Sequence, residues 1–152
     1  QNTGQIEGES PMQELEDRIV KEGKVLPGNI IKVDGFLNHR IDTELMDHIA
    51  EEFGKHFNMD EVTMILTAEA SGIALSAIVA HHFHKPMIFA KKAKSDNIEG
   101  GLYQSDFFYT YKKKDRRLLV SKEWLSASDK VLIIDDFMAR GEAMRGLCDI
   151  VR

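Results

Sequence analysis

The stretch VLIIDDFMARGEAMRG, residues Val131 to Gly146, constrains the fold more than any other part of the chain. Four aliphatic residues in a row are typical of a strand that is buried on both faces of a parallel sheet. Asp135 and Asp136 follow at the end of that strand, and a short loop then leads into a helical pattern. Because adjacent carboxylates repel each other, this pair indicates that a polar group or a cation lies between or above them.

The rest of the chain alternates between helix-like and strand-like patterns. The helical spacing of apolar residues predicts helices near 12–22, 42–57, 71–84 and 141–152. Short apolar or alternating runs predict strands near 30–36, 62–69, 85–90, 106–111, 117–125 and 130–136. This order predicts an α/β domain with a mainly parallel, twisted sheet flanked by helices. Asp42 or Thr43 is expected to cap the second helix.

The ends of the chain differ from its middle. The polar opening QNTGQIEGES has no apolar core, so residues 1–11 are predicted to be an expression remnant or a disordered arm. Residues 12–152 are then one domain, with a small hood at about 23–40 and a core at about 41–152. The last predicted helix reaches Arg152 without a stop signal, and we expect the domain to be incomplete at its C-terminus.

Charge and composition disfavour several classes of partner. The net charge is −5, whereas a duplex-binding surface normally needs a basic excess. No apolar run approaches the ~18 residues that a membrane span requires. Cys148 is the only cysteine, which excludes an internal disulfide and is typical of a reduced, intracellular setting. We therefore expect a cytoplasmic protein with no nucleic-acid or membrane partner.

The position of the acid pair predicts its ligand. Ligands of open α/β sheets bind beyond the carboxyl ends of the strands, where Asp135 and Asp136 are expected. Adjacent carboxylates suit a vicinal diol, which donates two hydrogen bonds, or a Mg²⁺ ion. Backbone N–H groups around Gly141, at the start of the last helix, would attract a phosphate. Together these features predict a site for a ribose 5-phosphate.

Three common types of nucleotide or phosphate site match the acid pair less well than a ribose 5-phosphate site does. A Walker B strand looks similar, but the chain has no GxxxxGK(S/T) motif, and it has no GxGxxG motif for a dinucleotide. A response-regulator pocket would need further carboxylates at an early strand end, and the early strands offer only Glu69. On composition alone, the alternative that Asp135 and Asp136 are only a solvated strand end without function also remains open.

Four motifs carry a resemblance to a known family. They are EGKVLPGNIIKVDGFLNHRID, EASGIA, FAKKAKS and VLIIDDFMARGEA. In this order and spacing the chain resembles the xanthine phosphoribosyltransferases, a family of type I phosphoribosyltransferases, over residues 12–152. The resemblance implies the fold of that family and a reaction of purine salvage, in which xanthine and 5-phosphoribosyl 1-pyrophosphate (PRPP) give xanthosine 5′-monophosphate and pyrophosphate. It also implies Mg²⁺ as cofactor and a homodimer.

The resemblance implies a role for each motif. Asp135 and Asp136 would be the catalytic acids that hold the ribose hydroxyls, directly or through Mg²⁺. The 5-phosphate would be bound by Ala139, Arg140, Gly141, Glu142 and Ala143. The pyrophosphate would be bound by Lys91, Lys92, Lys94, Ala70 and Ser71. The purine base would pack on Ile31 and accept and donate hydrogen bonds with Asn38. The family also uses a lysine on the C-terminal side of Arg152, so we expect an incomplete base pocket.

Several of these assignments have alternatives that the sequence leaves open. The lysines are otherwise a solvated basic loop, Ser71 a helix cap, and Asn38 a turn residue. Arg140 stands where the family is expected to have asparagine. Residues 95–104 are a loop that closes over the site or a plain surface turn. The base could be hypoxanthine, guanine or adenine, and a PRPP-sensing regulator without catalysis is the alternative outside the enzymes.

Overall fold

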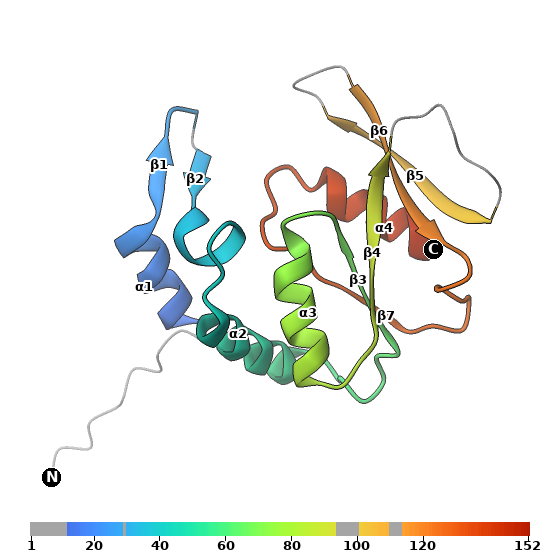
Figure 1. Ribbon diagram of the computed structural model, residues 1–152, viewed down its shortest axis with the longest axis horizontal. Coiled ribbons are helices and arrows are strands. Elements are labelled where there is room, and N and C mark those ends of the chain that lie inside the picture. Colours follow the sequence, from blue (N-terminus) through green and yellow to red (C-terminus); the bar gives the residue numbers. More distant parts are fainter. Residues whose placement is uncertain (1–11, 29, 94–100, 110–113) are drawn as a thin grey trace, which may run out of the picture.

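The computed structural model describes residues 12–28, 30–93, 101–109 and 114–152 (Figure 1). Its helices are α1 (Gln13–Glu22), α2 (Thr43–His56), α3 (Gly72–His82) and α4 (Glu142–Val151), with a π-helical turn η1 (Asp34–Asn38). Its strands are β1 (Lys24–Leu26), β2 (Ile30–Lys32), β3 (Met64–Ala68), β4 (Met87–Ala93), β5 (Leu102–Tyr109), β6 (Lys114–Ser121) and β7 (Val131–Ile133). The predicted 95–104 loop lies largely outside the described residues.

The main sheet has the strand order β5-β6-β4-β3-β7. One half is parallel: β3 pairs with β4 on one side and with β7, the last strand of this order, on the other. The other half is antiparallel, because β6 pairs in that sense with both β4 and β5. The predicted α/β fold is therefore confirmed, and the sheet is mixed, with its parallel part at the acid pair.

Helices cover both faces of the sheet, and β3 is therefore buried on both of its faces. Ile65 packs in the cluster that holds α2 and α3, whereas Leu66 and Ala68 pack with α4 on the opposite face. This alternation is the period of two expected of a strand. Figure 1 shows α3 in front of the sheet and α4 behind it. Within the described ranges, no helix combines the length and apolar character that crossing a bilayer requires.

The hood differs from its prediction. The expected strand 30–36 ends at Lys32, and η1 follows it. Phe36 and Leu37 are consecutive and both buried, which a helical turn allows and a strand with one exposed face does not. The residues between α1 and this strand, where no regular structure was predicted, contain β1, which pairs with β2. In the turn between the two strands, Gly28 has a φ of +90°. The boundary between hood and core stays a prediction.

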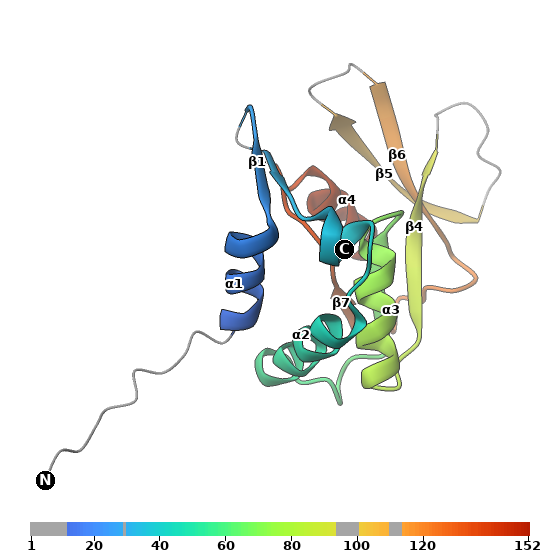
Figure 2. The same ribbon diagram turned by 60° about the vertical axis from the view of Figure 1, so that its left-hand side comes forward.

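Ion pairs and caps attach α1 to the start of α2. Arg18 of α1 contacts the carboxylate of Asp42 at 3.0 Å, and its guanidinium lies 5.1 Å from the ring centre of Phe36. Asp42 also accepts the backbone N–H of Leu45 at 3.2 Å, so the predicted cap of α2 is confirmed. Figure 2 shows α1 and the β1–β2 hairpin together, on the opposite side of α3 from β5 and β6.

Candidate functional site

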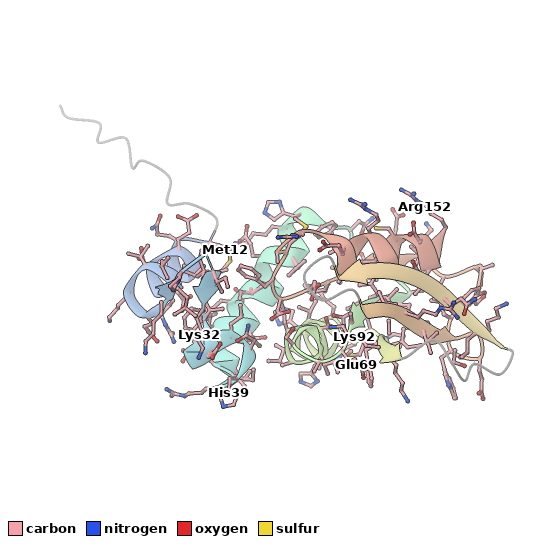
Figure 3. The ribbon with its side chains drawn as sticks, turned by 90° about the horizontal axis from the view of Figure 1, so that it is seen from above. Met12, Lys32, His39, Glu69, Lys92 and Arg152 are labelled. Atoms are coloured by element: carbon pink, nitrogen blue, oxygen red, sulfur yellow. The ribbon has the colours of Figure 1, made fainter. Side chains whose placement is uncertain are left out.

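A pocket of about 370 Å³ opens where β3, β4 and β7 end, facing the hood. It is lined by Ile30, Ile31, Asn38, Ala68, Ser71, Lys92 and every residue from Asp135 to Met144. Figure 3 shows the hood, which carries Lys32 and His39, across from Glu69 and Lys92. The pocket therefore lies at the carboxyl end of the parallel strands, as predicted.

The acid pair lies at the centre of this pocket. Both side chains are half-buried, and the backbone N–H of Asp136 donates to Asp135 Oδ1 at 3.0 Å. Burial raises the pKa of Asp135 to about 6, and the hydrogen bond and negative charge of Asp136 add to that rise; the positive charge of Lys92 partly opposes it. In the free protein the ionised form of Asp135 is therefore disfavoured. A ligand that brings hydrogen-bond donors or positive charge would stabilise that form, so such a ligand is favoured here.

The hood reaches the acid pair directly. Asn38 Nδ2 donates to Asp136 Oδ2 at 3.4 Å, although the two residues are 98 positions apart in the sequence. Ile31 lines the same pocket and is 41% exposed, so an apolar surface stands open beside the amide. A flat ring with polar edges would find both a packing surface and a hydrogen-bonding partner here.

The loop after the acid pair turns into α4 at Gly141. This residue has a left-handed φ of +76°, a conformation that glycine adopts without a steric penalty. Glu142 and Ala143, the first residues of α4, line the pocket, so the N-terminal end of this ten-residue helix faces it. Leu147 and Ile150 fix the helix from its buried face. Free N–H groups and the helix dipole attract an anion at such an end.

The segment after β3 forms the third wall. The Glu69–Ala70 peptide bond is cis, and Glu69 Oε1 accepts the backbone N–H of Lys92 at 2.6 Å. Ser71 lines the pocket and makes no capping hydrogen bond at the start of α3, so the cap alternative is not used here. Ser71 and Lys92 therefore line the same pocket as the acid pair.

The structure separates the members of the predicted lysine group. Lys92 lines the pocket, whereas Lys91 is exposed and is not among the lining residues. Neighbouring residues of a strand point to opposite faces, so β4 can direct only one of the two into the pocket. Ala70 is exposed and does not line it either, and Lys94 lies outside the described residues.

Sequence reasoning missed several contributors. Ile30, Ala68 and Met144 also line the pocket, as do Phe137 and Met138, which begin the loop that was expected after the acid pair. Each is a chain neighbour of a predicted element, and only the hairpin register and the loop path show that they face inward. Gly72 was expected only as a backbone donor, and its close packing was not predicted: a Cβ there would collide with Thr67 Oγ1 and stand 3.0 Å from Asp135 Oδ1. The small residue in EASGIA was the available signal for that close approach.

Comparisons with known proteins find relatives of this chain by sequence. No protein-family model matches the chain. It is 48% identical to the xanthine phosphoribosyltransferase of Bifidobacterium animalis subsp. lactis over 140 residues, which cover 91% of the chain and 72% of that protein. It is 51% identical to the xanthine phosphoribosyltransferase of Lachnoclostridium phytofermentans, with coverage of 92% and 72%.

Solved structures show the same architecture. Adenine phosphoribosyltransferase from Saccharomyces cerevisiae matches with a TM-score of 0.73 at 18% identity, covering 93% of the chain and 80% of that structure. The adenine phosphoribosyltransferase of Giardia lamblia matches with a TM-score of 0.70 at 20% identity, with coverage of 90% and 75%. At such identities the likeness is one of fold, and it confirms the predicted type I phosphoribosyltransferase fold.

Proposed function

The chain belongs to the xanthine phosphoribosyltransferase family, and we propose that it transfers the phosphoribosyl group of PRPP to xanthine. The products are xanthosine 5′-monophosphate and pyrophosphate, and the reaction is one of purine salvage. The enzyme is a glycosyltransferase of the pentosyl class. The family resemblance further motivates a homodimer and a cytoplasmic location as expectations.

One observation supports the proposal above all others. The acid pair, the N-terminal end of α4 and a hood amide face a single pocket of about 370 Å³. A ribose 5-phosphate needs acceptors for its hydroxyls and donors for its phosphate at a short, fixed separation. We assign the hydroxyls to Asp135 and Asp136 and the phosphate to the loop 139–143.

The chemistry of the transfer suits these groups. Displacement at an anomeric carbon builds positive charge on the sugar ring as pyrophosphate leaves. Two carboxylates beneath the ring stabilise that charge, and fixed N–H groups hold the phosphate so that the ring is oriented for attack. We assign Lys92 as the cation that neutralises the leaving group and Ser71 as a donor to it, because both residues line the pocket. The protein supplies placement and charge, and needs no nucleophile of its own.

The donor set fits a magnesium ion bound together with the substrate. Among the described residues no group of three or more His, Cys, Asp or Glu converges on one point. We therefore assign the ion to the two carboxylates of Asp135 and Asp136. Mg²⁺ commonly keeps only one or two protein carboxylates and completes its shell with waters and phosphate oxygens. When bound, it would neutralise the pyrophosphate charge.

The hood supports a purine as the acceptor. Ile31 offers a face for the ring, and the Asn38 amide both donates and accepts, which matches the N–H and C=O edge of an oxopurine. Asn38 is held by Asp136, so the base site and the ribose site share one hydrogen bond. Which oxopurine fits best depends on one or two hydrogen bonds, and the choice of xanthine comes from the family.

A panel assay tests the proposal. Xanthine, hypoxanthine, guanine and adenine are each supplied with PRPP and Mg²⁺, and pyrophosphate release is measured. We expect the highest kcat/KM with xanthine, and Asn38→Ala should raise the KM for the base while the exposed neighbour His39→Ala leaves it unchanged. A higher kcat/KM with another base would refute the choice of xanthine, and release with no base would refute the transfer itself.

A further inference from the structure

Thr67 of β3 carries a buried hydroxyl that the proposed mechanism does not use. Its side chain has no solvent exposure, and within the described part of the chain its Oγ1 has no hydrogen-bond partner. A buried polar atom without a partner costs about 1–3 kcal/mol. Valine has nearly the same shape and would suit a buried strand equally well. The hydroxyl, rather than the shape, therefore requires an explanation.

The surroundings of Thr67 point to Asp135. The alternation along β3 places Thr67 on the same face as Ile65, against α3. Gly72 at the start of α3 lies directly over it: a Cβ there would collide with Thr67 Oγ1 and stand 3.0 Å from Asp135 Oδ1. The hydroxyl and the carboxylate oxygen thus both border the space that glycine keeps free of a side chain.

The carboxylate has room for another donor. Asp135 Oδ1 accepts the backbone N–H of Asp136 at 3.0 Å, and a carboxylate oxygen accepts up to two hydrogen bonds. Thr67 itself does not line the pocket, so its hydroxyl would act on a ligand through Asp135 and not by direct contact. A small movement of the Asp135 side chain toward β3 would bring the two groups within hydrogen-bonding distance.

We propose that Thr67 is a positioning residue for Asp135, donating its hydroxyl to Oδ1 when the acid pair holds the ribose hydroxyls of PRPP. This inference rests on the proposed function. The hydrogen bond fixes the carboxylate in the orientation that receives the diol. In the ligand-free protein the hydroxyl stays unpaired, so the residue lowers the stability of the fold and raises the affinity for PRPP.

The opposite signs of these two effects define the test. Thr67→Val removes the hydroxyl and keeps the shape, whereas Thr67→Ser keeps the hydroxyl and removes a buried methyl. Ser76→Ala is the matched control, because Ser76 Oγ of α3 is likewise buried without a partner in the described residues and does not line the pocket. The dissociation constant of PRPP with Mg²⁺ is measured by titration calorimetry, and the unfolding temperature is measured without ligand.

We expect Thr67→Val to weaken PRPP binding about tenfold, the value of one hydrogen bond to a charged group, without lowering the unfolding temperature. Thr67→Ser should bind PRPP as the wild type does and unfold at a lower temperature, and Ser76→Ala should leave PRPP binding unchanged. Unaltered binding by Thr67→Val, or equal weakening by the valine and serine variants, would overturn the inference alone. A wild-type protein that does not bind PRPP would overturn the proposed function and the inference together.

Discussion

Replacing Asp135 by asparagine should stabilise the ligand-free protein at alkaline pH while removing its activity. Burial and the neighbouring Asp136 raise the pKa of Asp135 from 3.8 to about 6. The folded protein therefore holds this proton more tightly than the unfolded chain does. Stability is lost as the pH rises from about 4 to about 6, and the loss persists above that range. Asparagine does not ionise, so the Asp135→Asn protein does not lose stability in this way.

The size of the effect follows from the displacement of the pKa. Each pKa unit corresponds to about 1.36 kcal/mol, so the change from 3.8 to about 6 would cost about 3 kcal/mol without screening. Asp135 is only half-buried, and solvent screening reduces this to about 1–2 kcal/mol. For a chain of 152 residues, we expect the unfolding temperature of Asp135→Asn at pH 8 to lie roughly 3–6 °C above that of the wild type.

Thermal unfolding at pH 4 and pH 8 is the assay. The two proteins should unfold at similar temperatures at pH 4 and diverge at pH 8. Asp129→Asn is a control of opposite sign, because the backbone N–H of Ser126 and then the hydroxyl of Thr63 lower the pKa of Asp129; it should be destabilised at pH 8. An Asp135→Asn protein that unfolds at or below the wild-type temperature at pH 8 would refute the electrostatic account of the pocket.

Three further changes test separate parts of the structure. Gly72→Ala places a methyl against the Thr67 hydroxyl, so it should lower the free energy of unfolding by about 1–3 kcal/mol and weaken PRPP binding, both measurable by denaturation and calorimetry. Arg140→Asn removes a cation from the exposed phosphate loop, so the KM for PRPP should rise severalfold and depend less on salt. The Glu14 carboxylate raises the pKa of His48. The pair therefore stabilises the fold fully below pH 6.5, and this stabilisation is lost as the pH rises through the pKa of His48 in the folded protein. His48→Gln should lower the unfolding temperature more at pH 6 than at pH 9.

Each of these changes has a control or a contradicting result. Gly35→Ala adds a methyl that meets nothing within 4 Å, and it should be neutral in both assays. Equal effects of the two alanines would show that Gly72 is not held by close contact. An unchanged salt dependence in Arg140→Asn would place that arginine outside the phosphate site. An equal loss at both pH values in His48→Gln would remove the ion pair as its cause.

Local patterns predicted the fold because the strands beside the acid pair pack against both core clusters. The apolar run before Asp135 predicted a covered strand, and β7 pairs in parallel with β3 and contacts a cluster on each face. Asp42 was recognised as a cap because capping is a short-range interaction. The turn η1 was missed, since a helical turn of five residues has no periodicity to detect. β1 was hidden by the glycine and proline beside it.

The candidate site was predicted in its parts and not in its assembly. The acid pair and the loop 139–143 adjoin in sequence, so one motif indicated both. The contact of Asn38 with Asp136 joins residues 98 positions apart, and only tertiary packing brings them together. The split between Lys91 and Lys92 depends on the direction of β4. From the sequence, Thr67 is an ordinary strand residue, and only the structure shows that Gly72 and Asp135 lie close to it.

Turnover by the double variant Asp135→Asn with Asp136→Asn tests the central claim most directly. The claim is that these two carboxylates hold the ribose of PRPP while the loop 139–143 holds its phosphate. Two lost hydrogen bonds to charged groups predict a fall in kcat/KM for PRPP of about a thousandfold or more, with cooperative unfolding retained. A folded double variant with the kcat/KM of the wild type would contradict the assignment of the site.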